Sequence, residues 1–206
     1  MSDLKTIGEK MRIRVTFDEE MLGTTSFDPE LHETYIASKA PDAPSKEEEI
    51  KAVGVGDMIE RGMTGFPREN GKPFVWDYQF RGMLKDACGL LRRVPGTECS
   101  KMKNYKKIID GMIFVHPRKI ELQLPDGETV GDCQRPLRAS TPMGERVAIA
   151  HSETVPAGTS CELTIHMYDP KLKNLVLECF DYGADHGFGQ WRNSGKGTFH
   201  YEVLEQ

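Results

Sequence analysis

Several segments of the chain alternate between hydrophobic and polar residues, which is the pattern of a strand with one buried face. The clearest cover residues 12–17, 161–168 and 198–203. Two shorter pieces, 112–115 and 119–124, are apolar or alternating and lead to Pro125-Asp126-Gly127, a turn signature. Because the alternating strands leave one face in water, we expect an antiparallel sheet that is covered on one side only.

Residues 77–93 have the periodicity of an amphipathic helix. The apolar positions on one side are Phe80, Met83, Leu84, Ala87 and Leu91. Asp77 is a suitable N-cap. Arg81 and Lys85 are four residues apart, so we expect them to share one exposed ridge of this helix.

A second helix is expected after residue 169. Asp169 supplies an N-cap and Pro170 stands at the first helical position, where proline is favoured. The apolar stripe that follows consists of Leu172, Leu175, Val176, Cys179 and Phe180. Glycine is the usual residue just past a helix, so we expect this one to stop near Gly183.

In chain order these elements read strand, helix, strand, strand, helix, strand. This βαββαβ order is the ferredoxin-like (RRM-like) pattern of an α+β fold. We expect one domain over 1–206, with an insertion at 18–75 and a thumb-like excursion at 125–158. The insertion is expected to hold a short helix at 29–38 and a mobile, charge-rich stretch at 40–49. The prolines and glycines of the excursion favour short strand pieces over a compact hairpin.

Composition places the chain among soluble globular proteins, with 206 residues, 38% hydrophobic and 29% charged. No apolar run approaches the roughly 18 residues of a membrane span, and the first ten residues are too polar for a signal peptide. The 5 cysteines are scattered, which indicates free thiols in a reducing compartment. The absence of a C-x-x-C pair argues against structural zinc. We therefore expect a cytoplasmic protein without a membrane partner, a metal or a cofactor.

The net charge of −5 conceals an uneven distribution. Residues 1–60 hold 14 acids and 7 bases, whereas residues 81–119 hold 10 bases and 3 acids. A local basic stretch can attract phosphate even in an acidic chain, because salt confines charge effects to about 10 Å. The alternative interpretation is a solvated lysine face.

The segment between the second helix and the last strand is rich in glycine and polar residues. Its glycines are Gly187, Gly189, Gly195 and Gly197, and its other members include Gln190, Trp191, Arg192, Asn193, Ser194 and Lys196. The spacing fits neither a dinucleotide-binding fingerprint nor a Walker A loop. Glycines permit positive φ and close approach of another backbone. The donors, ring and cation between them suit a polar chain such as RNA. A purely structural loop with Trp191 packed on the sheet is the alternative.

The βαββαβ order and this G-h-G-x5-G-x-G loop together resemble the RAMP superfamily of CRISPR-associated RNA-binding proteins. Within it, the chain is most similar to the single-domain backbone subunits that coat guide RNA. Residues 71–85 are similar to the family's lead into the first helix, with Arg81 and Lys85 at its basic positions and Gly82 at its glycine. Residues 155–159 are similar to its P-x-G-[ST] approach to the third strand.

The chain departs from the family where a small-residue run precedes the first helix, because Val75-Trp-Asp-Tyr-Gln79 stands there instead. It is also similar to small standalone members of the fold that phages and prophages encode. The resemblance implies a non-catalytic protein that binds single-stranded RNA in a groove between the first helix, the glycine loop and the excursion. The implied RNA-binding residues are Arg81, Lys85, Arg135, Arg138, Arg146 and the loop residues Gly187, Gly189, Gln190, Trp191, Arg192, Asn193, Ser194, Gly195, Lys196 and Gly197.

Other interpretations stay open. Single-stranded DNA could replace RNA, copies could assemble side by side along a strand, and CRISPR-type proteins could be the partners. A phage anti-defence protein could use the fold to bind or mimic a CRISPR subunit, and the acidic first 60 residues favour this reading. A metal-independent ribonuclease would need an acid after the first strand, where Asp28 is the nearest. We expect the open sheet face to carry no exposed aromatic pair, which disfavours stacking of bases on the sheet.

Overall fold

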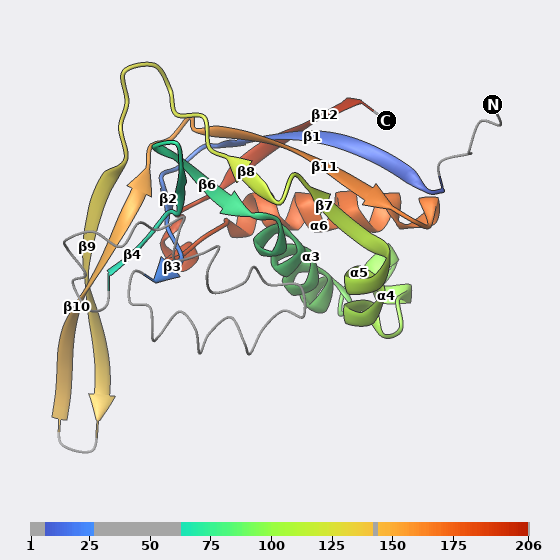
Figure 1. The fold of residues 1–206 in the computed structure, drawn as a ribbon. Helices are drawn as coiled ribbons and strands as arrows, with labels where there is room; N and C mark the ends of the chain where they lie inside the picture. The colour runs from blue at the N-terminus through green and yellow to red at the C-terminus, as the bar shows by residue number, and fades with distance from the viewer. Residues whose placement is uncertain (1–6, 27–62, 142–143, 206) are drawn as a thin grey trace.

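The computed structural model describes residues 7–26, 63–141 and 144–205, with the backbone alone for 137–141, 144–148 and 205. Its main sheet has the strand order β12 (Phe199–Glu205), β1 (Glu9–Phe17), β11 (Ser160–Met167) and β7 (Ile113–His116). All three strand pairs are antiparallel. The helices α3 (Asp77–Leu91) and α6 (Lys173–His186) lie against one side of this sheet (Figure 1). This arrangement is the expected α+β fold with the ferredoxin-like βαββαβ order.

Alternation along the strands decides which sheet face forms the core. Every second residue of β1, from Met11 to Phe17, is buried. The residues of β11 that pair with them, from Cys161 to Ile165, are buried as well. On the other face, Arg12 and Arg14 both donate hydrogen bonds to Glu162 of the neighbouring strand. The period of two therefore separates a hydrophobic side under the helices from a polar open side.

The two long helices pack against each other through aromatic and small residues. The Phe80 ring of α3 and the Phe180 ring of α6 are stacked, with centroids 6.4 Å apart. Gly183 lies inside α6 and does not end it, since the helix continues to His186. A Cβ at Gly183 would lie 2.9 Å from Met83 Sδ. Gly183, expected to end the helix, instead allows α6 to pack closely against Met83 of α3.

The helix starts differ in detail from the sequence expectation. Trp76 is the N-cap of α3 and Asp77 is its first residue. Asp169 does cap a helix, because its Oδ1 accepts a hydrogen bond of 3.0 Å from the Lys171 amide. That helix is the 3-10 turn η1 (Pro170–Leu172), which runs into α6.

Two short helices follow α3, namely α4 (Glu98–Lys101) and α5 (Tyr105–Met112). The sequence reading missed both, because neither is long enough to show a clear hydrophobic period. A three-stranded sheet of β5 (Arg68–Glu69), β6 (Lys72–Trp76) and β8 (Lys119–Glu121) leads into α3.

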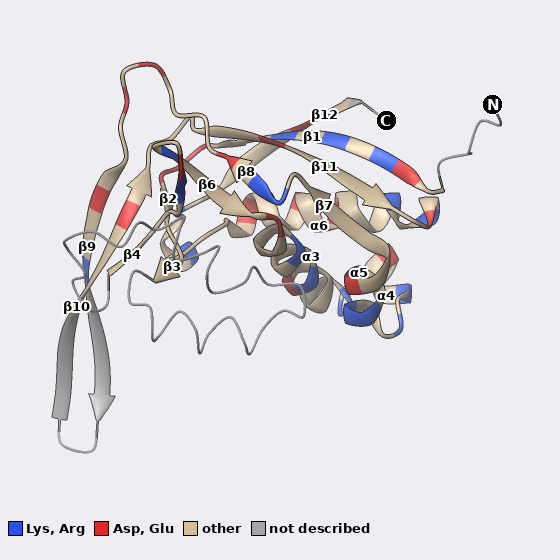
Figure 2. Cartoon of the chain, viewed as in Figure 1, with Lys and Arg blue, Asp and Glu red and all other residues tan. Residues whose placement is uncertain are grey.

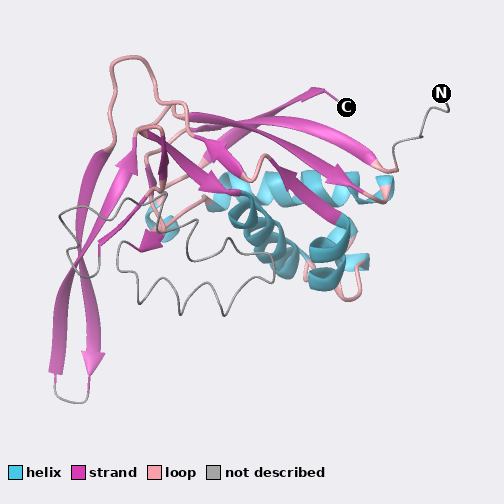
Figure 3. Cartoon of the chain, viewed as in Figure 1, coloured by secondary structure: helices cyan, strands magenta, loops and turns pink. Residues whose placement is uncertain are grey.

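The excursion forms one long hairpin of β9 (Gly131–Thr141) and β10 (Gly144–Val155), which corrects the expectation of short strand pieces. Its pairing is continuous from Gly131↔Thr154 to Thr141↔Gly144. Within the described part of the chain β9 pairs only with β10, so Pro136 sits on an edge strand, where a missing amide hydrogen costs little. Figure 3 shows the hairpin projecting away from the helices.

The base of the hairpin belongs to a second sheet. There β10 pairs with β2 (Met21–Leu22) and with β4 (Met63–Gly65), and β4 pairs with β3 (Thr25–Ser26). The helix expected at 29–38 and the stretch 40–49 lie outside the described residues. Among the helices that are described, none has both the length and the apolar character needed to cross a membrane.

Candidate nucleic-acid interface

The glycine loop, residues 187–198, folds tightly on itself between α6 and β12. Its four glycines have φ values of 84°, 87°, 80° and 72°, as the sequence predicts. The Phe188 amide donates a 2.8 Å hydrogen bond to the Gly197 carbonyl, and a Cβ on Gly197 would overlap the Phe188 carbonyl oxygen. A Cβ on Gly189 would lie 2.6 Å from the Leu22 carbonyl oxygen, which is also too close. The backbone that approaches these glycines is therefore the protein's own.

The loop rests on the first helix of the fold. Phe188 is buried, and its ring is stacked on Phe80 of α3 with centroids 4.6 Å apart. On the surface, Arg192 Nη1 lies 3.1 Å from Asp86 Oδ2 of the same helix. The structure thus brings the glycine loop against α3 through one hydrophobic and one charged contact.

Gln190 ties the same loop to the base of the hairpin. Its Nε2 donates to the Gly23 carbonyl at 2.9 Å and to Thr64 Oγ1 at 3.0 Å. Its Oε1 accepts a 2.6 Å hydrogen bond from Arg135 Nη2 of β9. Thr64 is in turn bonded to Ser152 of β10. Both the nitrogen and the oxygen of the Gln190 side chain are therefore hydrogen-bonded within the protein, and the bond to the oxygen fixes the position of Arg135.

Arg135 and Trp191 form the most distinctive pair of this region. Arg135 is only 9% exposed, and its guanidinium carbon lies 5.4 Å from the centre of the Trp191 ring. Trp191 is 41% exposed and has a left-handed backbone with φ 57°. The tryptophan is therefore a surface ring supported by a cation, in contrast to the expectation for a purely structural loop, in which it packs on the sheet.

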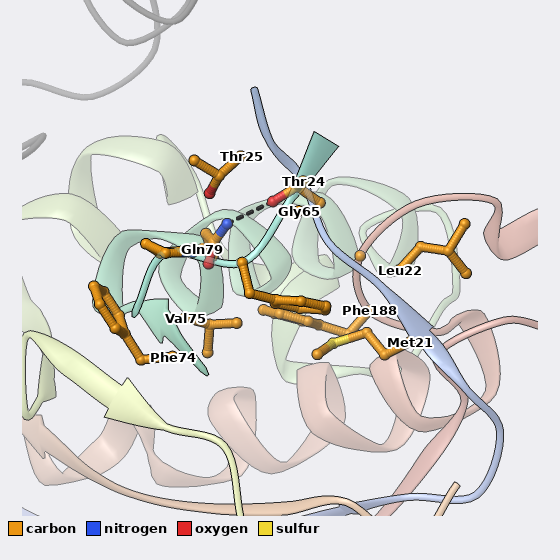
Figure 4. A pocket seen from close by; sticks show the side chains of 12 residues that line it. Met21, Leu22, Thr24, Thr25, Gly65, Phe74, Val75, Gln79 and Phe188 are labelled. Carbon is orange, nitrogen blue, oxygen red and sulfur yellow. Dashed lines mark hydrogen bonds between the residues drawn. The ribbon is translucent and has the colours of Figure 1, made fainter. Parts of the chain in front are cut away.

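A small hollow lies beside the loop, between β2, β6 and the start of α3 (Figure 4). Its cavity volume is about 10 Å³, room for about one water molecule, and Met21, Phe74, Val75 and Phe188 are among the side chains that line it. Gln79 Nε2 bridges its rim with a 2.6 Å hydrogen bond to Thr24 Oγ1. This volume is below the roughly 300 Å³ of the smallest ordinary ligand pockets. The hollow therefore does not favour a drug-sized ligand.

Arg81 does not stand on an exposed ridge, so that expectation is wrong. It is 5% exposed, and its Nη2 lies 3.6 Å from Asp77 Oδ2, one helical turn earlier. Burial raises the pKa of Asp77 above its usual value, although the Arg81 charge opposes this rise. The periodicity of α3 places residue 81 with Asp77 on the covered side, which removes Arg81 from the surface.

The other predicted cations near the loop also have acidic partners. Lys85 Nζ lies 2.8 Å from Asp110 Oδ1 of α5, and Lys196 Nζ lies 2.6 Å from Glu20 Oε1. The hydrogen bond to Glu20 raises the pKa of Lys196. Together with the Arg192–Asp86 pair, these contacts neutralise much of the expected positive groove. The basic stretch continues instead onto α4 and α5, where lysines are interspersed with the acids Glu98 and Asp110 (Figure 2).

The remaining residues predicted to bind RNA lie on the β9–β10 hairpin and in the glycine loop. Arg138 is on β9 opposite Val147, and Arg146 is on β10 opposite Ala139. Both are nearer the hairpin tip than Arg135. Asn193 and Ser194 are exposed in the 3-10 turn η2 (Arg192–Ser194), directly after Trp191. Asp28, the candidate acid of a ribonuclease, lies outside the described residues.

Sequence reasoning missed several members of the region. Asp86, Thr64 and Ser152 carry no motif, and only the fold brings them to the loop. The open face of the main sheet also differs from expectation, because Phe114 and Tyr168 lie there with ring centroids 5.6 Å apart. Tyr168 is 45% exposed, so this aromatic pair is a second surface on which a base could stack. Alternation along 113–116 could have revealed Phe114.

No protein-family model matches the sequence, and no curated protein resembles it significantly. Among solved structures, a chain of the Type III-B Cmr-beta complex bound to cognate target RNA has a TM-score of 0.51 at 9% identity. The alignment covers 96% of this chain and 60% of that one, so the protein spans only part of its length. A chain of a Type IV-B CRISPR complex has a TM-score of 0.47 at 14% identity, covering 96% and 91%. The Cmr-beta likeness shows that this chain shares its fold with part of a chain of the Type III-B Cmr-beta complex.

Proposed function

We propose that the protein binds single-stranded RNA without cutting it, at the junction of the glycine loop and the β9–β10 hairpin. The observation that carries the proposal is the exposed Trp191 ring, which makes a cation–π contact with the buried guanidinium of Arg135. A tryptophan at the surface in a left-handed backbone does nothing for the hydrophobic core. It is, however, well placed as a platform for an unpaired base.

The chemistry of this junction fits a polar, aromatic polymer. Stacking of a base on an aromatic side chain contributes about 1–3 kcal/mol and tolerates any base. The Arg135 charge beneath the ring makes the surroundings favourable for phosphate, and the exposed Asn193 and Ser194 offer hydrogen bonds next to it. Lys85 and the hairpin residues Arg138 and Arg146 are the further phosphate contacts of this proposal. Arg81 is not among them because it is buried.

The fold gives independent, if general, support. The Cmr-beta chain comes from a complex bound to cognate target RNA, so this fold is compatible with RNA as a neighbour. On this basis we propose that the protein acts as a non-catalytic, sequence-tolerant RNA-binding subunit. Copies of it would lie side by side along the strand or next to other CRISPR-type proteins.

Fluorescence anisotropy with labelled oligonucleotides tests the proposal. The protein should bind single-stranded oligo(U) and oligo(A) with similar affinity and bind duplex RNA more weakly, because a duplex offers no unstacked base. Affinity should fall as salt rises, with a shallow slope since many cations are already paired. The affinity for single-stranded DNA of the same length shows whether the protein prefers ribose or deoxyribose. Absence of binding to any single strand at low salt would overturn the proposal, and RNA fragments after incubation would overturn its non-catalytic part.

The neutralised cations favour a second candidate function. Because Lys85, Arg192 and Lys196 each have an acidic partner, the surface could instead face a protein. A phage-encoded anti-defence protein that binds or mimics a CRISPR subunit would have this property. Such a protein would purify free of nucleic acid, would not bind the oligonucleotides, and would form a complex with a purified CRISPR backbone subunit.

A further inference from the structure

Three cysteines that are far apart in the sequence meet inside the helical layer. They come from three helices: Cys88 from α3, Cys99 from α4 and Cys179 from α6. All three are completely buried, and their sulfur atoms lie within 4.8 Å of one another. None of the three cysteines belongs to the proposed RNA surface. Because each ligand sits on a different helix, no C-x-x-C spacing could have revealed it.

We propose that this trithiol cluster binds a soft, thiophilic cation, Cu⁺ or Zn²⁺, and thereby joins α3, α4 and α6. Thiolates are the protein ligands that select these ions. A tetrahedral ion with metal–sulfur bonds of about 2.3 Å holds its sulfurs about 3.8 Å apart. The Sγ atoms of Cys99 and Cys179 are already 3.8 Å apart. Small side-chain rotations would bring the third sulfur to the same spacing.

The protons of the cluster set the conditions for binding. Cys179 is a neutral thiol that donates to the Leu84 carbonyl at 3.5 Å. Binding therefore forms three metal–sulfur bonds and releases the protons of the neutral thiols to solvent, with no change of oxidation state. Affinity should rise with pH.

Helix α4 gives the cluster a route to solvent. It has only 4 residues, and the Glu178 carboxylate holds its first amides, those of Glu98 at 2.7 Å and Cys99 at 3.1 Å. Short segments tied by few hydrogen bonds open locally without global unfolding. An opening of α4 would expose Cys99, and a bound ion would then hold the helix against α6.

The chain supplies matched controls for a test of the proposal. Cys161 is equally buried but lies on β11, outside the cluster. Cys133, on β9, is only partly buried and would bind metal nonspecifically, so it is replaced by serine in every protein used. Full-length protein is prepared reduced and free of metal. It is then titrated with Zn²⁺ against a chromophoric chelator and, without oxygen, with Cu⁺.

We expect one equivalent of ion per chain in at least one arm and a higher thermal midpoint in its presence. Cys99→Ser and Cys88→Ser should each weaken binding by more than the roughly 10- to 100-fold that loss of an outer-shell partner costs. Cys161→Ser should bind like its parent. Equal binding by Cys99→Ser and its parent, or no saturable binding of either ion, would overturn the proposal. If a cluster variant does not fold, the test is the release of protons when Cd²⁺ is added to the parent protein. Release of protons supports binding by the thiols, and absence of release overturns the proposal.

Discussion

The guanidinium carbon of Arg135 lies 5.4 Å from the centre of the Trp191 ring, and this contact joins the β9–β10 hairpin to the glycine loop. The hydrogen bond of 2.6 Å between Arg135 and Gln190 fixes the cation beneath the ring. Residues 55 positions apart in sequence, Arg135 and Gln190, thus join the two segments into one surface. The proposed RNA-binding function depends on this surface, not on a broad positive groove.

Trp191→Ala should weaken binding of single-stranded RNA by roughly 5- to 150-fold, the equivalent of one lost stacking contact of about 1–3 kcal/mol. The thermal midpoint should change little, because the ring is 41% exposed and lies outside the hydrophobic core. Anisotropy titrations measure the affinity. Tyr168→Ala is the matched control, since it removes a similarly exposed ring from the open sheet face. Loss of affinity in the Tyr168 variant alone would place the RNA on the sheet instead.

Asp86→Asn should strengthen RNA binding, because it frees Arg192 from a 3.1 Å ion pair and removes a negative charge beside the loop. The gain should be roughly two- to fivefold at low salt, in line with the small energy of exposed ion pairs, and should vanish at high salt. Asp126→Asn makes the same charge change in a turn beyond the main sheet. An equal gain in both variants would mean that net charge alone is responsible.

Gly197→Ala and Gly195→Ala separate two roles of glycine in the loop. Both positions have positive φ, so each alanine should lower the free energy of unfolding by about 1–2 kcal/mol. At Gly197 the new Cβ would also collide with the Phe188 carbonyl, whereas nothing lies near Gly195. Urea denaturation should therefore show a clearly larger loss for Gly197→Ala. Equal losses would contradict the close approach of the two backbones.

His186 should make stability depend on pH. Burial lowers the pKa of His186, the Arg192 charge acts in the same direction, and Asp86 opposes them. The unfolded chain therefore takes up a proton near the ordinary pKa of about 6.5, while the native imidazole stays neutral to lower pH. The free energy of unfolding should fall as pH drops through this window. His186→Gln should flatten that fall in urea titrations at about pH 7 and pH 5.5; an identical fall in both proteins would exclude His186 as its cause.

The ferredoxin-like core could be predicted because local sequence patterns identify its strands and helices. Alternation along 12–17 and 161–168 and the helical period after Asp77 each depend on neighbours in sequence. The long hairpin was missed because Pro136 and Gly144 read as strand breakers. An edge strand tolerates the proline, and the glycine opens the returning strand.

The candidate site was harder to predict because its key contacts join distant segments. The glycine loop was recognisable by its spacing, but the partner of Arg192 was not, since Asp86 meets it only after α3 and the loop pack together. The burial of Arg81 also could not be predicted from local sequence. Its spacing from Lys85 indicates a shared ridge, yet the cover that buries it comes from tertiary structure.

Tryptophan fluorescence during an RNA titration tests the central claim most directly, because the chain has 2 tryptophans and Trp76 is completely buried. Stacking of a base on Trp191 should quench the emission in proportion to the RNA bound by anisotropy. Trp191→Phe should still bind RNA but lose the quenching. RNA binding without any change in emission, or the same quenching in Trp191→Phe, would contradict the account.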